Sequence, residues 1–190
     1  AETQPEVRRY DLVLDGYLDV QGVQPSPSGR FLAWSAWDEE GYALILQSME
    51  TGERSVLWRT PQMTSNAPYD VTFSPDESRV YFVSDGDLCW VPIQGGPPSL
   101  VSEVASSTSA IAGDGTIYFG GNEGVMKLPS DGGSLQRVTP TDTSLVYYMT
   151  PHLLPGERAL VYSGRLALRE GYRWTMFAHD LEDGRTVALE

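Results

Sequence analysis

The 190-residue sequence is poor in cysteine, lysine and histidine. Cys89 is the only cysteine, so no internal disulfide bond can form, and its position in the apolar run LCWV indicates packing rather than reactivity. The two histidines and the cysteine show no spacing typical of a metal site, so the sequence predicts no metal and no other cofactor. No apolar run approaches the roughly 20 residues that a membrane-spanning helix requires. The chain itself is therefore not expected to span a membrane.

Positive charge is also scarce. Lys127 is the only lysine, and the formal net charge is −13. Binding to nucleic acid or to anionic lipid requires a basic surface, so both are excluded as functions. The charge either keeps the protein soluble or provides an acidic face for a basic partner.

Signals of catalysis are missing too. The sequence contains no G-x-S-x-G nucleophile motif, and His152 and His179 lack the His-Glu pairing of zinc enzymes. His152 is interpreted as a hydrogen-bonded structural residue, with a catalytic or ligand-binding role as the alternative. We therefore expect no enzymatic activity, with a hydrolase or lyase site on a central axis as the least favoured reading.

One phrase recurs along the chain. The segment SPDESRVYFVS (74–84), a polar turn followed by a strand, matches SPSGRFLAWSA (26–36) and LPGERALVYSG (154–164). A copy one residue shorter, AGDGTIYFGG, covers 112–121. The proline or glycine in the second position of these copies recurs at spacings of 48, 38 and 42 residues. A repeat of this length indicates stacked structural units.

Each repeat contains four short alternating strands, which is typical of a propeller blade. A β-sandwich gives no reason for such a period, and a helical solenoid needs apolar spacings of three and four. The sequence therefore predicts an all-β, single-domain β-propeller of about four blades over 1–190. The expected blades are approximately 17–60, 66–104, 105–141 and 143–190, preceded by a strand at 7–14.

The repeats also predict a core and a set of turns. Phe82, Phe119, Tyr162 and Ala33 are interpreted as equivalent, buried positions in the strand after the turn. Asp76 in the second repeat is read as an Asx-turn residue in preference to a cation ligand, because its carboxylate can accept backbone N–H bonds two residues further on.

Two hairpins exceed what a blade requires: WDEEGY (37–42) and GRLALREGYRW (164–174). Long loops on a rigid scaffold often carry binding surfaces, and arginine and aromatic residues are enriched at binding hot spots. A solvated hairpin with no function is the alternative. The candidate partner-binding residues are Arg165, Leu168, Arg169, Tyr172, Arg173 and Trp37.

The segments SPSGRFLAW, FSPDESRVYFVSDGDLCWVPIQGG and YFGGNEGVMKLPSDGGSLQRVT resemble the repeats of TolB-type β-propellers. They are most similar to the propeller sensor domains of bacterial membrane-anchored serine/threonine kinases, although this chain contains no kinase motif. Departures occur at Ser28, at Glu77-Ser78 and at Gly113, where the family usually has aspartate, glycine and proline. These motifs specify turns, so the resemblance implies a fold more than a function.

The resemblance is to propellers with about six blades. We therefore expect an open or small propeller whose first and last blades present apolar faces for another protein or a second copy. The expected function is a non-catalytic interaction or scaffold module, an accessory subunit of a membrane-associated assembly. A ligand-sensing ectodomain related to receptor kinases is the alternative. Because the sequence starts with Ala1 and not with Met, we expect a periplasmic or other extracytoplasmic protein trimmed after a signal peptide, or a domain excised from a longer protein.

Overall fold

The structure, a computed structural model, describes residues 14, 16–60, 68–103, 109–129, 133–140 and 144–189. The strand predicted at 7–14 lies outside these residues except for Leu14. The described residues contain sixteen strands and no α-helix, which confirms the all-β prediction. Accordingly, none of them belongs to a helix suited to crossing a membrane.

The strands form four antiparallel sheets of four, each built from strands consecutive in sequence. The first sheet contains β1 (Leu18–Pro25), β2 (Phe31–Asp38), β3 (Gly41–Ser48) and β4 (Arg54–Arg59). The second contains β5 (Tyr69–Phe73), β6 (Arg79–Ser84), β7 (Asp87–Pro92) and β8 (Ser99–Ser102). The third contains β9 (Ser109–Ile111), β10 (Ile117–Gly120), β11 (Val125–Leu128) and β12 (Gln136–Arg137). The fourth contains β13 (Leu145–Leu153), β14 (Ala159–Leu168), β15 (Gly171–Asp180) and β16 (Thr186–Leu189).

The recurring turn connects the first two strands of every sheet. In the second sheet the amide of Ser74 donates to the Arg79 carbonyl, and the amide of Glu77 donates to the Ser74 carbonyl. The fourth residue of the turn has positive φ in every copy, and it is Gly29, Glu77, Gly115 or Glu157. Left-handed backbone is costly for glutamate, so two of the four turns carry strain that glycine would avoid.

Apolar clusters lie between consecutive sheets and hold them together. Phe82 packs against the first sheet, Phe119 against the second and Tyr162 against the third, and each is at most 2% exposed. These burial predictions are confirmed, as is that for Ala33. The predicted equivalence of Ala33 is wrong by one residue. Counted from the turn hydrogen bonds, Trp34 is the counterpart of Phe82, and Ala33 faces the opposite side of its sheet.

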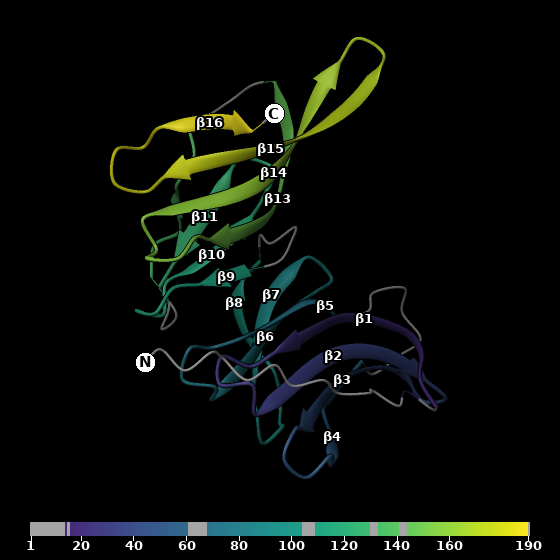
Figure 1. The fold of residues 1–190 in the computed structure, drawn as a ribbon. Coiled ribbons are helices and arrows are strands. Elements are labelled where there is room, and N and C mark those ends of the chain that lie inside the picture. Colours follow the sequence, from purple (N-terminus) through teal and green to yellow (C-terminus); the bar gives the residue numbers. More distant parts are fainter. Residues whose placement is uncertain are drawn as a thin grey trace, which may run out of the picture.

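The four sheets follow one another along an arc, with the first and the fourth at opposite ends (Figure 1). The arc confirms the prediction of an open or small propeller, but only one of its ends is an exposed apolar face. On the first sheet the outer side chains of Trp34, Ala36, Ala43 and Ile45 are fully buried. Leu14 and Tyr17 pack on them, so the expectation of an exposed first face is wrong.

Candidate functional site

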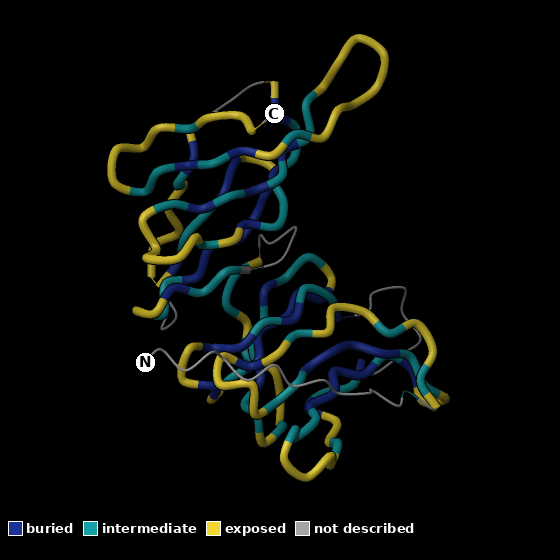
Figure 2. The backbone as a smooth tube through the Cα atoms, viewed as in Figure 1, coloured by how far each residue is buried: buried dark blue, intermediate teal, exposed yellow. Residues whose placement is uncertain are grey.

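The hairpin of β14 and β15 extends beyond the body of the molecule (Figure 1). Each of these strands has ten residues, whereas the corresponding strands have six in the second sheet and four in the third. The part from Arg165 to Trp174, called the arm here, closes with the two-residue turn Arg169-Glu170. Most of its residues are exposed, and no other sheet of the described residues covers it (Figure 2).

Arg165 anchors an aromatic cluster at the base of the arm. Its guanidinium carbon lies 4.3 Å from the ring centre of Tyr172, 5.3 Å from that of Tyr147 and 5.9 Å from that of Trp174. Contacts of this kind attract a cation to the face of the ring. Among the described residues, the buried Nε of Arg165 has no hydrogen-bond acceptor. The cluster therefore stiffens the base of the arm and fixes the positively charged guanidinium of Arg165 among three aromatic rings.

The tip of the arm combines exposed apolar groups with positive charge. Leu168 is 52% exposed and Tyr172 is 62% exposed. Arg169 and Arg173 are exposed beside them, and Glu170 is the only acidic residue of the arm. The structure thus brings together five of the six residues predicted to bind a partner.

The sixth, Trp37, lies apart. It belongs to β2 in the first sheet, at the other end of the arc (Figure 1). Its ring contacts that of Tyr42 edge to face, with ring centres 4.6 Å apart. Trp37 therefore cannot share one compact surface with the arm.

Below the arm, the side of the fourth sheet that faces away from the third is also apolar and exposed. Trp174 and Met176 are both 52% exposed, Val187 is 47% exposed and Leu189 is 42% exposed. We call this surface, centred on Met176, the outer face. Sequence reasoning identified the arm but assigned no individual residues to the outer face.

The two histidines have different surroundings. His179 is buried, and its Nδ1 lies 2.8 Å from Oγ1 of Thr186. Burial lowers the pKa of His179, although Asp180 and Asp183 oppose the shift. His152 is exposed in β13. The described residues contain no group of three or more metal-binding side chains.

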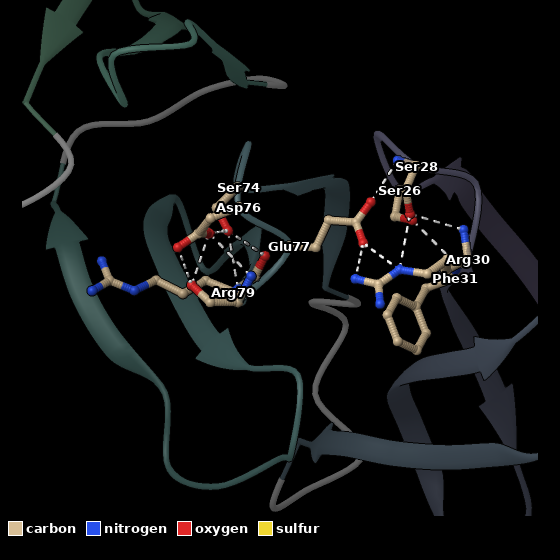
Figure 3. A network of polar contacts seen from close by, with 9 residues as sticks. Ser26, Ser28, Arg30, Phe31, Ser74, Asp76, Glu77 and Arg79 are labelled. Atoms are coloured by element: carbon tan, nitrogen blue, oxygen red, sulfur yellow. Dashed lines mark hydrogen bonds and ion pairs between the residues drawn. The ribbon is translucent and has the colours of Figure 1, made fainter.

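In the second turn, the carboxylate of Asp76 accepts hydrogen bonds from neighbouring residues of the same turn. Asp76 accepts hydrogen bonds from the Ser74 hydroxyl and from the amide and hydroxyl of Ser78, and these bonds lower its pKa to about 2 (Figure 3). This geometry confirms the Asx-turn reading. Asp76 also borders a hollow of about 250 Å³ between the second and third turns. The predicted absence of a cofactor stays a prediction.

Sequence reasoning missed a contact between neighbouring turns. Glu77 is only 5% exposed and reaches from the second sheet to the first, where it accepts hydrogen bonds from the Ser28 amide and, at 2.8 Å, from Arg30 (Figure 3). Glu157 repeats the contact between the fourth and third sheets, accepting from the Gly113 amide at 2.8 Å. The only sequence signal was glutamate in a position that favours glycine.

Comparison with solved structures identifies the architecture. The chain is similar to TolB from Agrobacterium tumefaciens, with a TM-score of 0.67 and 20% identity over 87% of this chain and 63% of that one. The fold is a β-propeller. A puromycin-hydrolysing peptidase of Mycobacterium tuberculosis superposes with a TM-score of 0.68 and 16% identity, over 90% of this chain and 29% of that one. A chain of a nidogen/laminin complex superposes with a TM-score of 0.65 and 10% identity, over 93% of this chain and 81% of that one.

These likenesses concern the propeller fold alone, because all three identities are low. The chain spans less than two thirds of the TolB and peptidase chains. No protein-family model matches the chain, and no curated protein matches it by sequence. Propellers of this kind occur in an enzyme and in a protein–protein complex alike, so the function must be argued from the arm and the outer face.

Proposed function

We propose that this propeller is a non-catalytic protein–protein interaction module that docks on a larger assembly through its arm. The observation that carries the proposal is the composition of the arm: exposed Tyr172 and Leu168 lie beside three arginines on a hairpin that projects from the body. Tyrosine and arginine dominate binding hot spots, and a hairpin stiffened by Arg165 loses little conformational freedom on binding.

The charge of the arm suggests the chemistry of the partner. The arm contains three arginines, Arg165, Arg169 and Arg173, and one glutamate, so it is positively charged. The whole chain, in contrast, has a net charge of −13. A partner surface that carries carboxylates around an apolar centre would be attracted to the arm. Its approach to the rest of this acidic protein would be repelled, which favours one orientation of docking.

We further propose that the protein is exported and acts as an accessory subunit of a membrane-associated assembly, as the resemblance to TolB-type repeats suggests. A second candidate is a ligand-sensing ectodomain related to those of receptor kinases. A thermal-shift screen of small molecules separates the two, because a sensor is stabilised by its ligand whereas a docking module is not. An axial hydrolase or lyase site is the least favoured alternative.

The test uses the purified chain to capture partners by chemical crosslinking in an envelope extract. Wild-type protein should capture one defined protein, whereas the double variant Arg169→Ser/Tyr172→Ser should lose it. The matched control is Leu100→Ser, which removes an exposed apolar residue from β8. Capture should also weaken as salt rises, because exposed charges are screened. Equal capture by the arm variant would exclude the arm as the docking element.

A further inference from the structure

A hollow of about 390 Å³, called the interblade hollow here, lies between the third and fourth blades. Its third-blade wall includes Lys127 and Gln136, which are cross-strand partners in β11 and β12. Its fourth-blade wall includes His179 of β15 and Leu181 in the turn that follows. Tyr118, the partner of Lys127 in β10, also lines the hollow and belongs to the apolar cluster that joins the two blades. The interblade hollow therefore lies within the arc, beside a packed contact between neighbouring sheets.

His179 contributes a buried polar group to this hollow. Its side chain is only 2% exposed, and its Nδ1 lies 2.8 Å from Oγ1 of Thr186. Its Nε2 has no hydrogen-bond partner in the described part of the chain. When the Thr186 hydroxyl donates to Nδ1, the ring proton lies on Nε2, which can then donate to a group in the hollow. Buried polar atoms are rarely left without a partner, so Nε2 points to an acceptor supplied by a ligand.

The interblade hollow also carries positive charge without a matching carboxylate. Lys127 and Arg137 border it, and neither forms a salt bridge with another described residue. The acidic residues at its rim are already engaged. The Glu182 carboxylate lies 2.7 Å from the Arg158 guanidinium, and Asp183 accepts a hydrogen bond from a backbone amide of its own turn. In a chain with a net charge of −13, two unpaired cationic side chains beside one hollow favour an anionic ligand.

We propose that the interblade hollow binds the phosphate group of a small molecule. The donors that border it are the Lys127 ammonium, the Arg137 guanidinium, the Tyr118 hydroxyl and Nε2 of His179. A phosphate accepts hydrogen bonds from several directions, and its bonds to lysine and arginine are charge-assisted. A carboxylate has only two oxygens and would satisfy fewer of these donors. Sites for small molecules commonly measure about 300–1,000 Å³, so the hollow also has room for an organic part of the ligand.

The proposed site is independent of the arm. His179 lies near the end of β15 that is remote from the arm, which begins this strand at Gly171. Phosphate binding would add ligand sensing, the second candidate function, to docking and would not replace it. Because the ligand would contact both blades, it should also stabilise the packing of the third blade on the fourth.

NMR of the imidazole signals of the purified full chain at pH 7 tests the site directly. Inorganic phosphate is titrated in, and sodium chloride keeps the ionic strength constant. The His179 signals should shift and saturate, because Nε2 gains an acceptor. Those of His152 should not move, since this exposed residue of β13 does not line the hollow. No shift at His179, or equal shifts at both histidines, would overturn the proposal.

Variants locate the binding. Lys127→Gln and Arg137→Gln should each weaken phosphate binding at least about tenfold, because a hydrogen bond between charged groups is lost. The matched control is Arg79→Gln, which removes the same charge from the second blade, where the guanidinium lies over the ring of Trp90. It should leave binding unchanged, and circular dichroism establishes that all three variants fold.

Two further outcomes would contradict the phosphate site. Equal binding by Lys127→Gln and Arg137→Gln would place the anion elsewhere, and tighter binding of succinate than of phosphate would exclude a phosphate group as the preferred ligand. Either result would leave capture through the arm, and with it the proposed function, standing.

Discussion

Glu77 shows how a single side chain can join two blades. It occupies a left-handed backbone position, with φ of 57°, that would suit glycine better. The strain is offset because the carboxylate spans to the first blade, where it meets the Ser28 amide and the Arg30 guanidinium (Figure 3). Burial alone would raise the pKa of Glu77, but these hydrogen bonds outweigh it and lower the pKa to about 2.

The depressed pKa makes the contact sensitive to acid. A carboxylate with a pKa of 4.5 when unfolded and about 2 when folded contributes stability that is complete above pH 4.5 and lost as the pH falls toward 2. Glu77→Gln should therefore lower the free energy of unfolding by about 1–3 kcal/mol at neutral pH, since hydrogen bonds to a charged group are lost. Urea unfolding at pH 7 and pH 3 measures the effect.

The Glu77→Gln variant should lose less free energy of unfolding between pH 7 and pH 3 than the wild type does, because it has no carboxylate at this position to protonate. Glu157→Gln is the matched control, because Glu157 makes the corresponding contact at an exposed site and should matter less. A Glu77 variant with unchanged stability at neutral pH would show that the contact contributes nothing.

Phe82 tests the core at the same scale. It is fully buried and stacks on Trp58, with ring centres 5.0 Å apart, between the first and second blades. Phe82→Ala should destabilise the protein by about 3–5 kcal/mol, because a cavity replaces the ring. Leu100→Ala, at the one exposed position of β8, is the control, and chemical denaturation is the measurement. A loss below about 1 kcal/mol for Phe82→Ala would contradict the placement of this residue in the core.

At the scale of elements, turns and strands could be predicted from the sequence because they follow local rules. Asp85-Gly86 joins β6 to β7 with positive φ at both residues, as this dipeptide favours. The extended hairpin at 164–174 could be predicted because the sequence between the two strands is longer than a blade requires. The aromatic cluster at its base could not be predicted, because it also includes Tyr147, which comes from another strand. The one-residue error at Ala33 arose because alternation gives period two without saying which side faces the next blade.

The arm beyond Leu166 should be dispensable for folding, since Leu166 is the only arm residue that packs against an apolar cluster of the described residues. Leu166 and Arg173 are cross-strand partners, so residues 167–172 can be replaced by Asn-Gly to close a shorter hairpin. The melting temperature of this variant should stay within a few degrees of the wild-type value. Partner capture should be lost. A large drop in melting temperature would show that the arm supports the core, and it would weaken the case for a docking role.

At the scale of the molecule, the sequence repeat predicted four blades. It did not predict that the outer side chains of the first blade are buried while those of the fourth blade are exposed. Leu14 and Tyr17 cover the first blade, where the guanidinium of Arg54 also lies over the rings of Tyr17 and Trp34. Leu14, Tyr17 and Arg54 lie outside the repeated phrase, so the repeat carried no signal for this cover. The fourth blade has no such cover among the described residues.

The central claim is that the four described blades form an open arc, with the first and the fourth blades at its opposite ends. Spin-label distances test it most directly, using Val56→Cys paired with Val187→Cys, and Val56→Cys paired with Leu100→Cys, both in a Cys89→Ser background. These exposed sites lie on β4, β16 and β8, the last strands of the first, fourth and second blades. Labelled protein is diluted into unlabelled protein so that only distances within one chain contribute. An open arc predicts a much longer distance for Val56–Val187 than for Val56–Leu100, whereas nearly equal distances would reveal a closed four-bladed ring and contradict the account.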